Sequence, residues 1–266
     1  MGLLLAWPAA GRPVPLRILC TSDLDGRAFP LVSAETSLQQ LRPAVEAECA
    51  TSATPPVRID LGGLFGGSPE AEVAETAAAR MAASMKYDAA LLAASDVRMP
   101  PDVLKAALER FGSPVLAANA RPAGNGPLWP GWCRTVVVER GGVRIALIGL
   151  LDPDLPRCIP AECLPPAWLD GRDEALAAVW PEVREADVTI VLTRWEAGRR
   201  RSAVRVAERL LDRYPGLDLV LAGGLSEPLP CTRVRGGAVA GGAPFGEGLL
   251  RVDLVYDTVL GEAVSV

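Results

Sequence analysis

The chain has 266 residues, of which 50% are hydrophobic and 22% are charged, and its formal net charge is −5 at pH 7. This length and composition are enough to bury a sizeable core, and they are not those of a disordered chain. The negative balance argues against nucleic acid as a partner. None of the apolar runs approaches the length of a membrane span.

Histidine is absent from the chain. Its absence excludes Ser-His and Cys-His nucleophile systems, zinc sites of the H-E-x-x-H kind and histidine-ligated haem. Six cysteines are present without any C-x-x-C pair. Cys158 and Cys163 lie in a proline-rich loop, where either a local disulfide or two free thiols fit the pattern. A thiol-redox function for this pair lacks a neighbouring residue that would lower a thiol pKa.

We expect residues 1–15 to be an N-terminal tail or the remnant of a signal peptide, because they are apolar and small but lack a basic region. Residues 16–266 contain neither an internal repeat nor a long linker, which predicts a single domain.

In the first half, strands predicted at 16–20, 57–61, 89–93 and 114–118 alternate with helices at 33–49, 69–85 and 102–111. Pro43 is expected to interrupt or kink the first helix. Strands at 135–139 and 143–150 flank Arg140-Gly141-Gly142, a hairpin signature.

In the second half, a helix at 173–185, a strand at 188–193, a helix at 199–214 and a strand at 217–222 follow. Segments 249–256 and 260–266 read as a closing antiparallel pair. The glycine pairs at 236–237 and 241–242 are interpreted as turns. The mixture predicts an α/β fold of two packed sheets flanked by helices.

Seven segments at the expected strand ends occur in a recognisable order: Leu16–Gly26, Arg58–Ser68, Tyr87–Asp96, Pro114–Asn119, Gly142–Gly149, Asp187–Arg194 and Leu217–Glu227. Ligand sites of such sheets lie at these loops. The first segment contains I-L-C-T-S-D-L-D-G, and it resembles I-L-H-T-N-D-x-H-G of the 5'-nucleotidase branch of calcineurin-like metallophosphoesterases. The resemblance runs from Leu16 to Asp257 and implies a four-layer α-β-β-α sandwich of the metallo-dependent phosphatase type.

That family holds two metal ions, which bind the phosphate and generate the attacking hydroxide. The positions that match its metal-site residues are Asp23, Asp25, Gly63, Ser95, Asp96, Arg194, Leu225 and Glu227. Asp23 keeps the family's residue type, whereas Gly63 replaces the bridging aspartate and Arg194 replaces a histidine. The resemblance therefore implies that the two-metal centre is lost and that the chain has neither a catalytic residue nor a cofactor.

The acids at these positions need a compensating charge if they are packed together. We expect Arg194 to supply it to Asp23, Asp25, Asp96 and Glu227, since its guanidinium carries a permanent charge. In one alternative Arg194 points into solvent. In another, Asp23, Asp25 and Glu227 form a single weak site for magnesium or calcium.

The preferred interpretation is a non-catalytic, metallophosphoesterase-like protein that acts as a binding partner or subunit of a larger assembly, with another protein as its partner. The rival is a divergent phosphoester hydrolase with a carboxylate-only metal site. The resemblance implies a periplasmic or otherwise exported protein, and a complete N-terminus would instead imply the cytoplasm.

Overall fold

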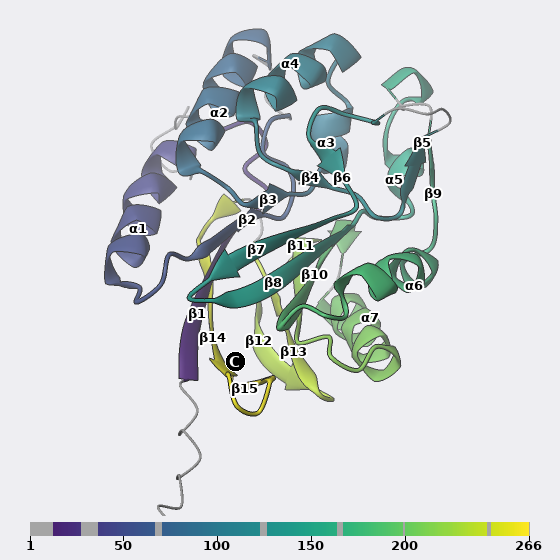
Figure 1. The fold of residues 1–266 in the computed structure, drawn as a ribbon. Helices are drawn as coiled ribbons and strands as arrows, with labels where there is room; N and C mark the ends of the chain where they lie inside the picture. Colours follow the sequence, from purple (N-terminus) through teal and green to yellow (C-terminus); the bar gives the residue numbers. More distant parts are fainter. Residues whose placement is uncertain are drawn as a thin grey trace, which may run out of the picture.

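The computed structural model of the chain describes residues 13–27, 37–66, 71–122, 127–163, 167–198, 200–243 and 246–265. Two mixed sheets form its centre (Figure 1). The strands of the seven-stranded sheet are, in spatial order, β15 (Glu262–Ser265), β14 (Leu250–Asp257), β1 (Pro13–Thr21), β2 (Val57–Asp60), β3 (Ala89–Ala90), β4 (Val115–Leu116) and β6 (Trp132–Cys133). Those of the six-stranded sheet are β12 (Leu229–Val234), β13 (Gly237–Gly241), β11 (Leu219–Leu225), β10 (Val188–Gly198), β8 (Val143–Leu150) and β7 (Thr135–Arg140). A separate pair joins β5 (Ala120–Pro122) to β9 (Ala167–Leu169).

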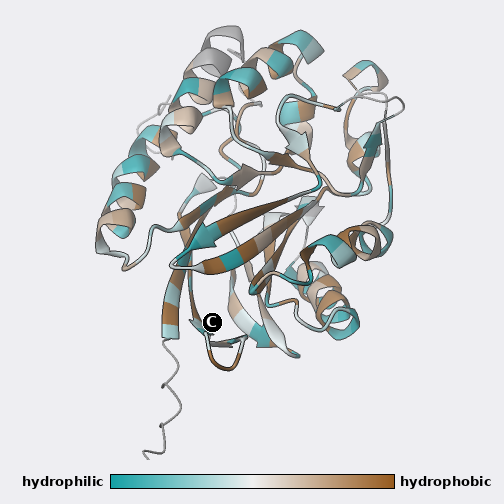
Figure 2. Cartoon of the chain, viewed as in Figure 1, coloured by the Kyte–Doolittle hydropathy of each residue, from teal (hydrophilic) through white to brown (hydrophobic). Residues whose placement is uncertain are grey.

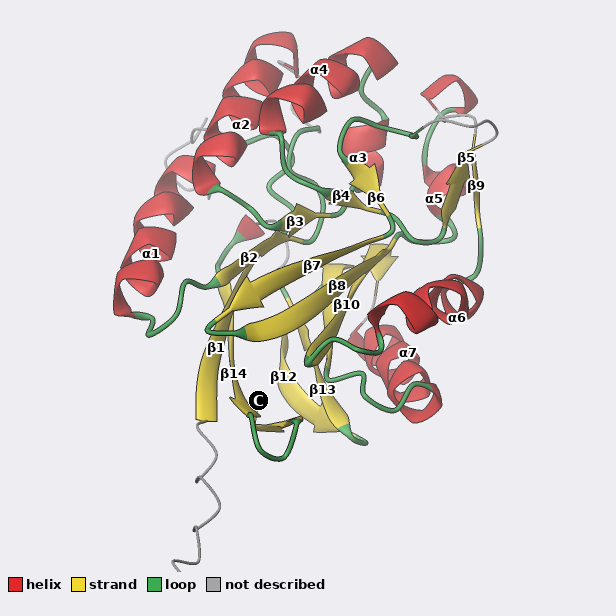
Figure 3. Cartoon of the chain, in the orientation of Figure 1, coloured by secondary structure: helices red, strands yellow, loops and turns green. Residues whose placement is uncertain are grey.

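Helices cover the outer face of each sheet (Figures 1 and 3). On the seven-stranded sheet they are α1 (Leu38–Thr51), α2 (Ala71–Met85) and α4 (Pro101–Phe111), and on the six-stranded sheet α6 (Arg172–Val183) and α7 (Arg200–Arg213). The short helices α3 (Ala94–Val97), α5 (Leu155–Cys158) and η1 (Ala161–Cys163) lie in loops. The predicted α/β fold with four α-β-β-α layers is confirmed.

The six-stranded sheet is buried on both faces, and this explains its continuous apolar strands. Along β8, Ile145 and Leu147 belong to the core shared with the seven-stranded sheet, whereas Ala146 and Ile148 belong to the core beneath α6 and α7. Successive side chains of a strand point to opposite faces, so the two cores alternate residue by residue. Figure 2 shows the hydrophobic colour concentrated on these central strands.

Several local expectations need correction. Strand β1 begins at Pro13, so residues 13–15 are not part of a tail, and residues 1–12 lie outside the described residues. Pro43 lies within α1, where the carbonyl that loses its partner belongs to the exposed residue Gln39. Gly237 and Gly241 do not form turns but bound β13, which pairs in parallel with β11.

The predicted hairpin is confirmed as β7 and β8, and the closing antiparallel pair as β14 and β15. Parallel strands β1 to β4 of one sheet, and β8, β10, β11 and β13 of the other, each bring their carboxyl ends to one edge. None of the described helices has the length and apolar character needed to cross a membrane.

Asp60 closes β2 in a fully buried position. The Thr21 hydroxyl donates a hydrogen bond to its Oδ2 at 2.5 Å, and the Gly62 amide donates to its Oδ1 at 2.8 Å. Burial raises the pKa of Asp60 to about 7, and the hydrogen bonds from Thr21 and Gly62 offset only part of that rise. The folded protein therefore favours the neutral carboxyl group more strongly than the unfolded chain does.

Stability should consequently depend on the charge of Asp60. Because its folded pKa lies above its ordinary value of 3.8, its contribution is present below that value and is lost as the pH rises towards and through 7. Between pH 5 and pH 8 the wild-type chain should lose on the order of 2 kcal/mol of unfolding free energy relative to Asp60→Asn. Urea unfolding of both proteins at the two pH values measures this, and a pH-independent difference would contradict it.

Candidate functional site

A cavity of about 450 Å³ opens where the strand ends of the two sheets meet. Its lining comes from the loop after β1, from α3 and α5, and from the ends of β10 and β11. The lining residues are Asp23, Asp25, Ala94, Ser95, Arg98, Cys158, Arg194, Glu196, Gly224, Leu225 and Ser226. Five of the positions predicted from the sequence therefore lie on one cavity: Asp23, Asp25, Ser95, Arg194 and Leu225.

The guanidinium of Arg194 is buried at the floor of this cavity, with 4% of the residue exposed. Its Nη1 lies 2.7 Å from Asp23 Oδ1, and its Nε lies 3.5 Å from Glu196 Oε1. Nη1 is also 3.4 Å from the carbonyl oxygens of Leu61 and Gly62. Burial alone would lower the pKa of Arg194, but the carboxylates of Asp23 and Glu196 outweigh it and raise the pKa. The expected ion pair with Asp23 is confirmed, and the solvent-pointing alternative is wrong.

The negative charge of Asp96 is stabilised by backbone amides. Its buried carboxylate accepts hydrogen bonds of 2.7–3.1 Å from the amides of Gly63, Phe65, Gly66 and Ala93. Amides aimed at a carboxylate stabilise its charge without a cation. Within the described residues Arg194 makes no ion pair with Asp96, although the charge of Asp96 still acts on the guanidinium. The role of Asp96 is to join the loop after β2 to the loop before α3.

Gly63 has φ +80°, and a Cβ there would lie 3.1 Å from Asp23 Cα and 3.2 Å from Asp25 Oδ1. The Asp25 carboxyl group thus stands beside the space that a side chain at position 63 would need. Burial raises the pKa of Asp25, and the charges of Asp96 and Asp23 raise it further. The neighbouring Ser95 hydroxyl lowers that pKa. The Ser95 oxygen is buried and has no well-formed hydrogen bond within the described residues.

Glu196 belongs to the site, although the sequence did not single it out. Its carboxylate accepts a hydrogen bond of 3.0 Å from the Ala94 amide, in addition to its contact with Arg194. Burial raises the pKa of Glu196, while Arg194 acts against that rise. The available signal was its position two residues after Arg194, which places both side chains on one face if the strand continues.

Glu227, in contrast, is exposed in the turn between β11 and β12 and does not line the cavity. The carboxylate set of Asp23, Asp25 and Glu227 is therefore not assembled. Among the described residues, no three acid or cysteine side chains are placed to hold a metal ion. With a buried guanidinium on Asp23 and no side chain at Gly63, the residues present do not fit the family's two-metal centre.

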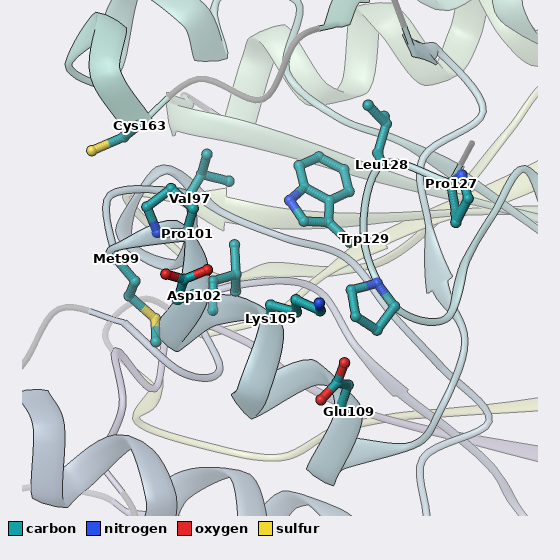
Figure 4. Close-up of a pocket in the computed structure, with 12 residues that line it drawn as sticks. Val97, Met99, Pro101, Asp102, Lys105, Glu109, Pro127, Leu128, Trp129 and Cys163 are labelled. Carbon is teal, nitrogen blue, oxygen red and sulfur yellow. The ribbon is translucent and has the colours of Figure 1, made fainter. Parts of the chain in front are cut away.

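A disulfide between Cys158 and Cys163 is not formed, since both cysteines are free thiols. Arg98 lies between them: its Nε and Nη2 donate to the Cys158 carbonyl, while its own carbonyl accepts from Cys163 Sγ at 3.5 Å. Cys158 lines the strand-end cavity, whereas Cys163 lines a second cavity of about 610 Å³ beside α4. Figure 4 shows this second cavity, with Trp129 across from Lys105.

No protein-family model and no curated protein matches the chain. Several solved structures, in contrast, match most of the chain. A Staphylococcus aureus protein assigned as a 5'-nucleotidase is 20% identical with a TM-score of 0.78, over 94% of this chain and 52% of that one. A calcineurin-like phosphoesterase from Bacillus subtilis is 16% identical with a TM-score of 0.77, over 96% and 89%. A 5'-nucleotidase precursor from Thermus thermophilus is 19% identical with a TM-score of 0.75, over 94% and 53%.

These likenesses establish that the chain has the fold of calcineurin-like phosphoesterases and 5'-nucleotidases. The chain spans about half the length of the two 5'-nucleotidases that it matches.

Removal of the buried guanidinium should be costly. Arg194→Ala leaves Asp23 and Glu196 without their counter-charge, so the free energy of unfolding should fall by about 3–5 kcal/mol. Adding Asp23→Asn should recover part of that loss, since it removes one of the uncompensated charges.

The matched control is Arg121→Ala, which breaks an exposed pair with Asp170 and should cost less than about 1 kcal/mol. Urea unfolding of the four proteins compares these effects. The interpretation fails if Arg194→Ala is as stable as the control variant.

Proposed function

We propose that the chain is a non-catalytic protein with a metallophosphoesterase fold, which acts as a binding partner or subunit of a larger assembly. The observation that carries the proposal is the buried ion pair between Arg194 and Asp23 on the floor of the strand-end cavity. The resemblance assigns metal-ligand positions to both residues, and here they satisfy each other.

Electrostatics support this interpretation. A guanidinium cannot be deprotonated in a protein, so Arg194 repels a divalent cation at any pH at which the chain is folded. Asp23 Oδ1 is already engaged by Arg194, and Asp96 is engaged by four backbone amides. Gly63 offers no ligand atom on a side chain. A Lewis-acid route to phosphate-ester hydrolysis therefore lacks the donor set that it needs.

The extent of the structural likeness supports the assembly part of the proposal. In the two 5'-nucleotidases the shared fold accounts for about half of a longer chain, so this fold is one part of a larger molecule there, whereas it makes up 89% of the Bacillus subtilis phosphoesterase. Here a strand-end cavity is open at the surface, with the exposed residues Arg98 and Ser226 in its lining. A surface of this kind fits a protein whose partner completes the site.

The proposal predicts a protein without stoichiometric metal. After purification and incubation with magnesium, manganese, zinc or calcium, elemental analysis should find well under one bound ion per chain. Hydrolysis of adenosine monophosphate and of bis-p-nitrophenyl phosphate should not exceed that of an Asp23→Asn control, because no metal-bound nucleophile is formed. Two bound ions per chain, or metal-dependent turnover that Asp23→Asn abolishes, would support the divergent hydrolase instead.

The assembly is tested separately. The full chain, tagged and expressed at its native level in its source cell, should elute from size-exclusion chromatography with one partner at fixed stoichiometry. Light scattering should give a mass above the 28.0 kDa of the chain. Elution as a monomer at native concentration would refute the subunit role.

A further inference from the structure

We infer that the strand-end cavity accepts an arginine side chain from the partner protein, and that this side chain pairs with Asp25 beside the Ser95 hydroxyl. The inference rests on the proposed function, because it names the chemistry by which the partner is recognised. It comes from the polar groups of the cavity that the chain itself leaves unsatisfied.

Asp25 differs from the other two carboxylates of the lining. Asp23 is paired with Arg194, and Glu196 is held by Arg194 and by the Ala94 amide. Within the described residues Asp25 has no ion pair, although its carboxyl group faces the cavity and is partly buried. The negative charges of Asp96 and Asp23 act on this carboxyl group and Arg194 only partly opposes them, so a further cation in the cavity would be favoured beside it.

Ser95 supplies a second unsatisfied group from a different element. Its oxygen, on α3, is buried without a hydrogen-bond partner within the described residues, and it lies on the same cavity as Asp25. A hydroxyl accepts as well as donates, so a ligand with several N–H donors can satisfy both residues. The planar guanidinium of arginine presents five such donors in a fork that matches a carboxylate.

The net charge of the residues that line the cavity favours a ligand with a single positive charge. Asp23, Asp25 and Glu196 contribute three negative charges, against two positive charges from Arg98 and Arg194. One monovalent cation balances this difference. A divalent ion would exceed it beside a buried guanidinium, and an anion would add to the negative excess. A cavity of about 450 Å³ admits a single long side chain more readily than a folded segment.

Arg98 provides a means of distinguishing a cationic ligand from an anionic one. It is exposed and lines the cavity, and within the described part of the chain it is held by the Cys158 carbonyl and by no carboxylate. Its positive charge opposes a bound guanidinium. Arg98→Ala should therefore strengthen the binding of an arginine side chain and weaken the binding of phosphate or a nucleotide.

The test titrates the full chain with N-acetyl-L-arginine amide at low salt, with binding followed by amide NMR shifts. Wild type should bind it with a Kd on the order of 1 mM. Asp25→Asn should weaken binding at least tenfold, and Ser95→Ala should weaken it several-fold. Asn is well suited to the φ of +47° at position 25, so the fold is retained. The control Asp154→Asn removes an exposed carboxylate outside the cavity lining and should bind like wild type.

Three results would overturn the inference. The first is the absence of binding, or binding that Asp25→Asn does not change. The second is tighter binding of adenosine monophosphate or phosphate that Arg98→Ala weakens, since it would identify an anion site. The third is Asp25-dependent binding of magnesium or manganese, which would overturn the proposed function as well. The first two leave the metal analysis intact, so failure of the inference is distinguishable from failure of the proposed function.

Discussion

The buried guanidinium of Arg194 is the interaction on which the strand-end arrangement depends. It is carried by β10 of the six-stranded sheet, yet its contacts are with Asp23 and with the carbonyls of Leu61 and Gly62, which follow β1 and β2 of the other sheet. A buried charge is tolerated only when it is paired and hydrogen-bonded. The edge at which the two sheets meet is therefore specified by polar contacts, whereas the faces of the sheets are specified by apolar ones. The absence of a side chain at Gly62 leaves room for Arg194, because a Cβ at position 62 would lie 3.3 Å from Arg194 Cδ.

Charge compensation at this edge is divided between two centres that share the loop after β2. Arg194 compensates Asp23 and Glu196, while the amides of that loop compensate Asp96. Gly63 serves both, since its N–H donates to Asp96 and its lack of a side chain leaves room for the Asp25 carboxyl group. Asp23, Glu196 and Asp96 are thus compensated within the chain, whereas Asp25 has no ion pair among the described residues.

The convergence of the strand ends and the contact of Arg194 with one of the neighbouring acids follow from the sequence, because parallel strands must bring their carboxyl ends to one edge. Glu196 was missed since β10 continues through a bulge to Gly198, and the tryptophan, glutamate, alanine and glycine there lack a strand pattern. Strand β13 was missed because its Gly-Ala-Val-Ala-Gly sequence is typical of turns. The cradle of Asp96 has no sequence signature at all, for backbone amides belong to every residue. Glu227 was misplaced because β11 ends at Leu225 and the chain turns at once.

The polar side chains of the cavity that lack partners indicate a ligand more directly than those that are already paired. Leu225 lines the same cavity and only 4% of the residue is exposed. The fold therefore accommodates an apolar side chain in this lining and does not require every lining residue to be polar. A partly buried carboxylate without a counter-charge, such as Asp25, reduces stability in its charged form, and a buried hydroxyl without a partner, such as Ser95, does the same. Their combined cost would be offset by a ligand that brings donors and one positive charge. In the assembly that we propose, relief of this cost would be one contribution to the affinity for the partner.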